Sequence, residues 1–249
     1  PKGRFAKRAT KRPDPKRPGW ILVVQKDPLK AKLPVIRALK EKVEHGVFGY
    51  PSGISGDADE LSGLRSAIIG RMADRFNWEI KPEDIVFIPG VVTGFNLANH
   101  AFISDSQGVL IQTPVYPPIL KSAESTGKVY QAMEMDRNET GYYEVDWYLF
   151  SESITPETKV FILCNPHNPV GKVFSRVELE RTAELCLKEG VLICSDEIHC
   201  DLVYKGYDHI PIASLDWEVA QSTITLMAPS KTYNLPGLQC SFAIIQNEK

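Results

Sequence analysis

The 249-residue sequence lacks the features that would place it in a membrane or in a disulfide-stapled secreted scaffold. No apolar run approaches the ~18 residues that a membrane-spanning helix needs, and no signal-peptide pattern opens the chain. Cysteine is scarce: the chain has 5, an odd number, with no CxxC pair. We therefore expect reduced thiols, a cytoplasmic location and no membrane partner.

Motifs for nucleotides and metals are also missing. No GxGxxG follows a predicted strand and no GxxxxGK[ST] occurs, which excludes the dinucleotide fingerprint and the P-loop. Asp196, His199 and Asp201 are close in the sequence, but their spacing is not that of a zinc site. We expect no metal ion.

An excess of charge of one sign is absent from the whole chain but not from its beginning. The net charge is −2, whereas residues 1–19 carry eight basic side chains against the single acid Asp14. Because this head is rich in proline and almost free of apolar residues, we expect a solvated, flexible tail. A basic run is weak evidence for attraction to nucleic acid or an anionic surface, and we expect no nucleic-acid partner.

What the sequence does contain is a regular alternation of strands and helices. Runs rich in β-branched residues predict strands, and segments with helical periodicity lie between several of them. Such uniformly apolar strands favour an α/β fold, with a mostly parallel sheet sandwiched by helices. The predicted strands are 21–24, 85–88, 109–111, 129–133, 160–163, 191–193, 223–227 and 242–245, and the predicted helices are 34–45, 58–77, 94–103, 117–126 and 176–189.

The residues that follow five of these strands are polar or aromatic. Because ligands of parallel sheets bind at the carboxyl ends of the strands, we expect these residues to meet at one edge. They are Pro89–Gly94, Thr113–Tyr116, Asn165–Gly171, Ser195–His199 and Pro229–Thr232.

Each of these segments is weak evidence when taken alone. The turn at Gly90–Gly94 can present backbone N–H groups to an anion at a helix N-terminus, but such a turn is more often only a turn. Partial desolvation would make Lys231 an amine nucleophile, although a lysine after a strand is more often a surface residue. Asp196 could equally cap the segment that follows it.

Their combination is far more specific, since the turn, an aromatic residue, Asn, Asp and Lys occur in this order, each one strand further along. A pyridoxal-phosphate site needs an anion nest, an aromatic face, a donor to the ring hydroxyl, a carboxylate for the pyridine nitrogen and a lysine. The order of the five groups therefore predicts a pyridoxal 5'-phosphate site.

The motifs also resemble a known family. The chain from about residue 46 to 246 is similar to the large domain of the fold-type-I pyridoxal-phosphate enzymes of the class I/II aminotransferase superfamily. Within it, the chain resembles the MalY/PatB-type cystathionine β-lyase branch of the carbon–sulfur lyases. The residues that carry the resemblance are Glu44–Tyr50, Pro89–Thr93, Pro114–Tyr116, Cys164–Gly171, Ser195–His199 and Pro229–Gln239.

The resemblance implies a division into domains. Residues 1–19 are a basic head outside the family, and residues 20–45 are an N-terminal segment that is part of the small domain in the family. Residues 46–249 are the cofactor-binding large domain, with the aspartate aminotransferase fold. The C-terminal small domain of the family is expected to be absent from this chain.

The resemblance also implies roles for the residues around the cofactor ring. Lys231 would attach the cofactor and later move the α-proton of the substrate. Asp196 would pair with the pyridine nitrogen, Asn168 would bond the ring hydroxyl and Tyr116 would stack on the ring.

A second set of residues is implied around the phosphate and the partner subunit. Val91, Val92 and Ser230 would help to hold the phosphate, and His199 would belong to the same cofactor site. Tyr50 would reach the phosphate of the partner subunit, so a homodimer is implied.

Two positions bear on the reaction. Many aminotransferases have a Gly-x-Arg after the lysine and a Tyr three residues after the Asp, whereas this chain has Gln239 and His199 there, as the carbon–sulfur lyase branch commonly does. The implied reaction is α,β-elimination of cystathionine or a cysteine S-conjugate to a thiol, pyruvate and ammonia. A class I/II aminotransferase and a catalytically dead cofactor-binding module remain alternatives.

Overall fold

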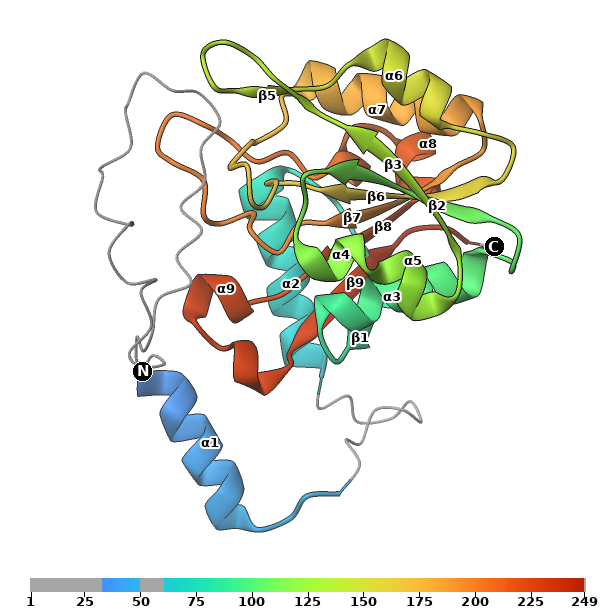
Figure 1. The fold of residues 1–249 in the computed structure, drawn as a ribbon. Coiled ribbons are helices and arrows are strands. Elements are labelled where there is room, and N and C mark those ends of the chain that lie inside the picture. The colour runs from blue at the N-terminus through green and yellow to red at the C-terminus, as the bar shows by residue number, and fades with distance from the viewer. Residues whose placement is uncertain (1–32, 50–60, 249) are drawn as a thin grey trace, which may run out of the picture.

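The fold is built on a seven-stranded sheet with the strand order β1-β9-β8-β7-β6-β2-β3 (Figure 1). The computed structural model describes residues 33–49 and 61–248, so the predicted strand 21–24 and the basic head lie outside the described residues. The strands are β1 (Ile85–Ile88), β2 (Gly108–Thr113), β3 (Val129–Glu134), β6 (Thr158–Cys164), β7 (Leu192–Asp196), β8 (Thr223–Met227) and β9 (Ser241–Ile245).

The pairing of these strands is mostly parallel, which confirms the predicted α/β class. The exception is β9, which runs antiparallel to both β8 and β1. Apolar periodicity carries no information on strand direction, so the sequence did not predict this reversal. Its cause is the connection between β8 and β9, which contains only two short helical turns and returns at the same end of the sheet.

Helices cover both faces of the sheet (Figure 1). Val109 and Ile111 face the cluster that contains Phe95, whereas Leu110 faces the cluster that contains Phe150, because successive side chains of a strand point to opposite faces. The helices are α1 (Leu33–His45), α2 (Ser62–Phe76), α3 (Val91–Phe102), α4 (Pro117–Leu120), α5 (Ser122–Thr126), α6 (Trp147–Ser153), α7 (Arg176–Lys188), α8 (Trp217–Gln221) and α9 (Ser230–Tyr233).

Several elements of the described chain had no clear signal in the sequence. They include α6, α8, α9 and the two-stranded pair of β4 (Asp136–Arg137) with β5 (Tyr143–Glu144). Each is short, so apolar periodicity has too few residues in which to appear. Among the described residues, no helix has the length and apolar character needed to cross a membrane.

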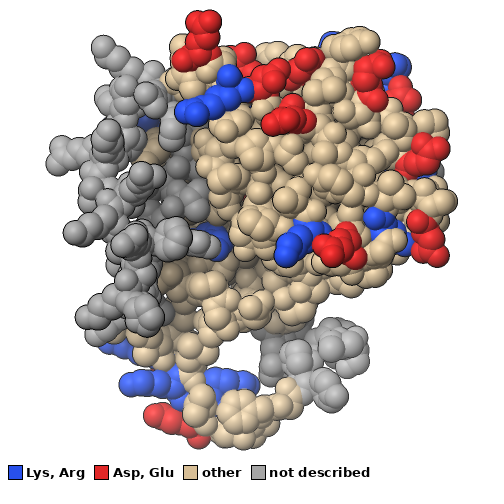
Figure 2. Space-filling view, in the orientation of Figure 1, with Lys and Arg blue, Asp and Glu red and all other residues tan. Residues whose placement is uncertain are grey.

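Helix α1 differs from the others because none of its residues is buried. It stands away from the sheet in Figure 1 and exposes apolar side chains, including Leu39 and Val43. The face of the molecule in Figure 2 carries acidic and basic side chains interspersed around an uncharged middle, so charge of one sign does not dominate the described residues on that face.

Gly94 allows α3 to lie close to the sheet. A Cβ atom at this position would lie 2.6 Å from Cδ1 of Ile88 and 2.9 Å from Cδ2 of Leu226. These separations are far shorter than a van der Waals contact, so any side chain at this position would displace the Ile88 and Leu226 side chains or push the helix away from β1 and β8. The close approach fixes the start of α3 at the carboxyl ends of the strands.

We expect Gly94→Ala to lower the free energy of unfolding by about 1–3 kcal/mol, because the added methyl group overpacks the contact between helix and sheet. The measurement is urea unfolding. Gly70→Ala is the matched control: Gly70 lies inside α2, and a Cβ there would meet no atom within 4 Å. That substitution should raise the free energy by up to about 1 kcal/mol, because Ala favours the helix. Equal effects at both sites would contradict the interpretation.

Candidate active site

The carboxyl ends of the strands surround a cavity of about 220 Å³. Of the nine residues predicted for the cofactor site, eight line this cavity, and Tyr50 lies outside the described residues. The eight are Val91, Val92, Tyr116, Asn168, Asp196, His199, Ser230 and Lys231.

One end of the cavity is suited to an anion. Helix α3 begins here after Gly90, which supplies no side chain to cap the first N–H groups of the helix. The Ser241 hydroxyl, at the start of β9, accepts a hydrogen bond from the Gly90 N–H at 2.7 Å and donates one to the Ile88 carbonyl at 2.7 Å. The turn before the helix is therefore held from both sides.

Gly90 also has a backbone conformation that favours glycine. Its φ is +108°, and a Cβ there would lie 2.8 Å from Oε1 of Gln239. Gln239 and Cys240 complete this part of the wall, from the segment before β9. In the sequence, Gln239 stood out only as the replacement for an arginine, and Cys240 had no signal.

The carboxyl group of Asp196 lies deep in the cavity. It closes β7 instead of following the strand as predicted, it is paired with Cys164 of β6, and the residue is 4% exposed. Burial raises the pKa of this carboxyl to about 7. A hydrogen bond from the Ile198 N–H at 3.1 Å and the nearby charge of Lys231 oppose that rise.

Lys231 lies on the single turn of α9 and is half-buried in the cavity wall. Its positive charge acts on two neighbours, lowering the pKa of Asp196 and that of His199. An amine, a carboxyl group and an imidazole therefore lie within electrostatic reach of one another. This is a site at which protons can be held or moved.

Tyr116, Asn168 and His199 form further parts of the wall. Tyr116 precedes α4, and the backbone N–H of Asn168 points to the Cys164 sulfur at 3.5 Å. Burial lowers the pKa of His199 to about 4, so its ring is neutral at pH 7. Nδ1 of this buried ring has no partner among the described residues, which leaves it available to a bound group.

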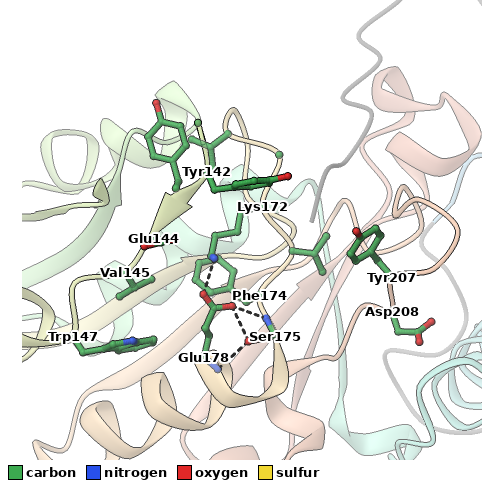
Figure 3. Close-up of a pocket in the computed structure, with 15 residues that line it drawn as sticks. Tyr142, Glu144, Val145, Trp147, Lys172, Phe174, Ser175, Glu178, Tyr207 and Asp208 are labelled. Carbon is green, nitrogen blue, oxygen red and sulfur yellow. Dashed lines mark hydrogen bonds and ion pairs between the residues drawn. The ribbon is translucent and has the colours of Figure 1, made fainter. Parts of the chain in front are cut away.

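A second, larger cavity of about 580 Å³ was not predicted, and none of the nine residues predicted for the cofactor site lines it (Figure 3). It has aromatic walls that include Tyr142, Trp147 and Tyr207. Lys172 and Glu178 form an ion pair of 2.6 Å at its side. Its residues come from loops, from β5 and from the first turns of α6 and α7, and two of them, Val170 and Gly171, end the predicted segment Asn165–Gly171. Among the described residues there is no cluster of side chains able to hold a metal ion.

Comparison with known proteins identifies the family. The family described as aminotransferase class I and II matches residues 27–249, so the chain belongs to it. Cystathionine β-lyase PatB of Bacillus subtilis (strain 168) is 38% identical over 230 residues, which cover 92% of this chain and 56% of PatB. The predicted family resemblance is thereby confirmed.

Solved structures agree with this assignment. OvoB is 40% identical with a TM-score of 0.82, and the match covers 93% of this chain and 59% of OvoB. Cystalysin from Treponema denticola, whose crystal structure contains a pyridoxal 5'-phosphate cofactor, is 33% identical with a TM-score of 0.80. The match covers 88% of this chain and 54% of cystalysin. The chain thus spans little more than half the length of these relatives.

The raised pKa of Asp196 predicts a pH-dependent gain in stability for Asp196→Asn. In the unfolded chain this carboxyl ionises near pH 4, whereas the fold holds it protonated up to about pH 7. The wild-type chain without cofactor therefore loses stability through this group as the pH rises from 4 to 7, by on the order of 4 kcal/mol. We expect a higher Tm for Asp196→Asn at pH 8 and little difference at pH 4, measured by circular dichroism.

Two histidines also affect how stability depends on pH, but they act equally in the wild-type chain and in Asp196→Asn. Burial lowers the pKa of His167 and His199 to about 4, so each destabilises the chain as the pH falls below about 6.5. The difference between variant and wild type isolates Asp196. Asp105→Asn, at an exposed carboxylate, is the control and should give no such gain. An advantage for Asp196→Asn that is the same at both pH values would contradict the burial argument.

Proposed function

We propose that this chain holds pyridoxal 5'-phosphate in the 220 Å³ cavity. The observation that carries the proposal is the convergence of Lys231, Asp196 and the start of α3 on one cavity. The groups fit the cofactor, because the cavity offers N–H groups for an anion, a carboxyl for a ring nitrogen and an amine for an aldehyde. The unpartnered Nδ1 of His199 is a further polar atom that a bound group would satisfy.

The residues keep the roles predicted for them. Val91 and Val92 would bind the phosphate through backbone N–H groups, and Ser230 through its hydroxyl. Tyr116 would lie against the ring, and Asn168 would donate a hydrogen bond to the ring hydroxyl. Residues 46–249 would form the cofactor-binding domain, and residues 20–45 would belong with the small domain.

The chemistry follows from the charges in the cavity. Pyridoxal phosphate, when bound, supplies an electron sink for the electron pair left on the substrate α-carbon. The Asp196 carboxylate would hold a proton on the ring nitrogen. This ion pair would lower the pKa of the carboxyl below the value of about 7 that it has in the cofactor-free chain. The Lys231 amine would take the α-proton as a general base, because it lies in the wall of the same cavity as Asp196.

We further propose carbon–sulfur β-lyase activity on cystathionine or a cysteine S-conjugate. Support comes from PatB at 38% identity, compared with 26–28% for the aspartate aminotransferases that the chain also matches. Gln239 and His199, both in the cavity wall, stand where many aminotransferases have Arg and Tyr. The products would be a thiol, pyruvate and ammonia.

Incubation of the chain with pyridoxal phosphate and cystathionine tests this proposal. We expect pyruvate and ammonia to form without an added keto acid. Dependence on a keto acid would indicate an aminotransferase, and cofactor binding without any product would indicate a binding module. Lys231→Ala should lower the rate by about 10²–10⁴-fold, because it removes the proton-transfer group. The control is Lys188→Ala, an exposed lysine paired with Glu189.

We also propose that the chain forms a homodimer through α1, in a cytoplasmic protein. Leu39 is 45% and Val43 64% exposed, one turn apart on the same face of a helix that buries none of its residues. A second copy would cover this face, and Tyr50 would reach the cofactor of that copy. The location rests on the five cysteines, which are all free thiols.

The pair Leu39→Glu and Val43→Glu should weaken the dimer by about tenfold or more, because two buried apolar side chains become charged. Sedimentation velocity over a concentration series measures the shift. Arg37→Glu serves as the control, since Arg37 lies about 160° around the helix from Leu39. A chain that is monomeric before substitution, or a variant that dimerises as tightly as wild type, would contradict the assignment.

A further inference from the structure

Asp201 joins two elements that are far apart in the sequence. One carboxylate oxygen, Oδ1, accepts a hydrogen bond and ion pair from the Arg71 guanidinium of α2. The other, Oδ2, accepts a hydrogen bond from the Thr232 hydroxyl of α9 at 2.7 Å. The Asp201 side chain is 14% exposed and the Arg71 side chain 36%, so the bridge is largely shielded from water.

The bond between Thr232 and Asp201 holds α9, the helix that carries Lys231. Helix α9 has four residues and ends at Tyr233, and the next residue, Asn234, has a φ of +57°. A single turn has little stability of its own, so its orientation depends on contacts with its surroundings. Thr232 directly follows Lys231, and the bond from Thr232 to Asp201 therefore holds the neighbour of the amine-bearing residue.

Packing between α2 and α9 is incomplete at the same place. A third cavity, also of about 220 Å³ and mainly apolar, lies between them. Arg71 and Asp201 line it together with Tyr233, the last residue of α9. Where side chains leave a void, dispersion contacts are lost, so polar contacts carry more of the positional restraint.

Asp201 also anchors the other wall of the active-site cavity. It lies between His199 and Leu202, which both line that cavity. This segment is a tight turn, with the Cys200 N–H donating to the Glu197 carbonyl at 3.0 Å and the Leu202 N–H donating to the His199 carbonyl at 2.8 Å. One carboxylate thus connects the turn that carries His199 with the turn that carries Lys231.

We propose that Asp201 is a positioning residue, and that the bridge from Arg71 through Asp201 to Thr232 sets the orientation of α9 and the placement of the Lys231 amine. The inference rests on the proposed function, because the amine matters there as the group that attaches the cofactor. Arg71 balances the charge of the Asp201 carboxylate and holds its other oxygen within hydrogen-bond distance of the Thr232 hydroxyl.

The test uses the full 249-residue chain with pyridoxal phosphate and two readouts: the cofactor dissociation constant and the visible circular dichroism of cofactor attached to Lys231. Thr232→Val removes the hydroxyl at nearly constant shape. We expect a dissociation constant about tenfold higher, the effect typical of a lost hydrogen bond to a charged group, and a weaker dichroic signal. Arg71→Met should act in the same direction, and Arg71→Lys, which keeps the charge, should restore most of the signal.

The control is Thr182→Val, which removes a buried hydroxyl that donates to the Glu178 carbonyl at 2.8 Å within α7. It should lower the Tm and leave the dichroic signal unchanged. The inference is overturned if Thr232→Val and Arg71→Met keep the wild-type signal and affinity. Thr232→Val replaces one side chain by another of the same shape, so it remains informative even where Asp201→Ala does not fold.

Failure of the proposed function is a separate result. A wild-type chain that binds no pyridoxal phosphate, or that keeps it covalently bound in Lys231→Ala, would overturn that function. The placement of the amine is then tested without cofactor, from the rate at which trinitrobenzenesulfonate labels Lys231, followed by peptide mass spectrometry. We expect Thr232→Val to change this rate several-fold and Thr182→Val to leave it unchanged, and equal rates in all three proteins would overturn the inference.

Discussion

Desolvation of the Asp196 carboxyl is the constraint on which the cavity depends. The group closes a central strand, and its neighbours include the thiols of Cys164 and Cys194, whose pKa values are raised by burial, so both stay neutral. Little in this environment stabilises an ionised carboxylate except the Ile198 N–H and the charge of Lys231. A cationic group placed against Asp196 would relieve that cost, and a protonated ring nitrogen would do so in the pairing proposed above.

Much of this site could be predicted because of a simple property of parallel sheets. Each strand delivers the residue after it to the same edge, so Tyr116, Asn168, Asp196 and Lys231 were expected to converge although up to 115 positions separate them. The order of chemical groups along the chain then matched the needs of one cofactor. Neither step requires knowledge of side-chain packing.

The features that could not be predicted depend on contacts between distant segments. The direction of β9, the aromatic cavity beside β5 and the bond from Asp201 to Thr232 each arise where loops meet. Loop conformations leave no periodic signal in the sequence, and the geometry of an ion pair across 130 positions depends on the whole fold. Arg71 illustrates the limit, since on the sequence it is one more basic residue of an amphipathic helix.

The reversal of β9 has a consequence for the dimensions of the site. Lys231 and Ser241 belong to one short segment that leaves the sheet after β8 and re-enters it as β9, and the Ser241 hydroxyl holds the turn at Gly90. The amine end and the anion end of the cavity are therefore spaced by a single stretch of ten residues. A residue inserted into or deleted from that stretch would therefore move Lys231 relative to the turn at Gly90.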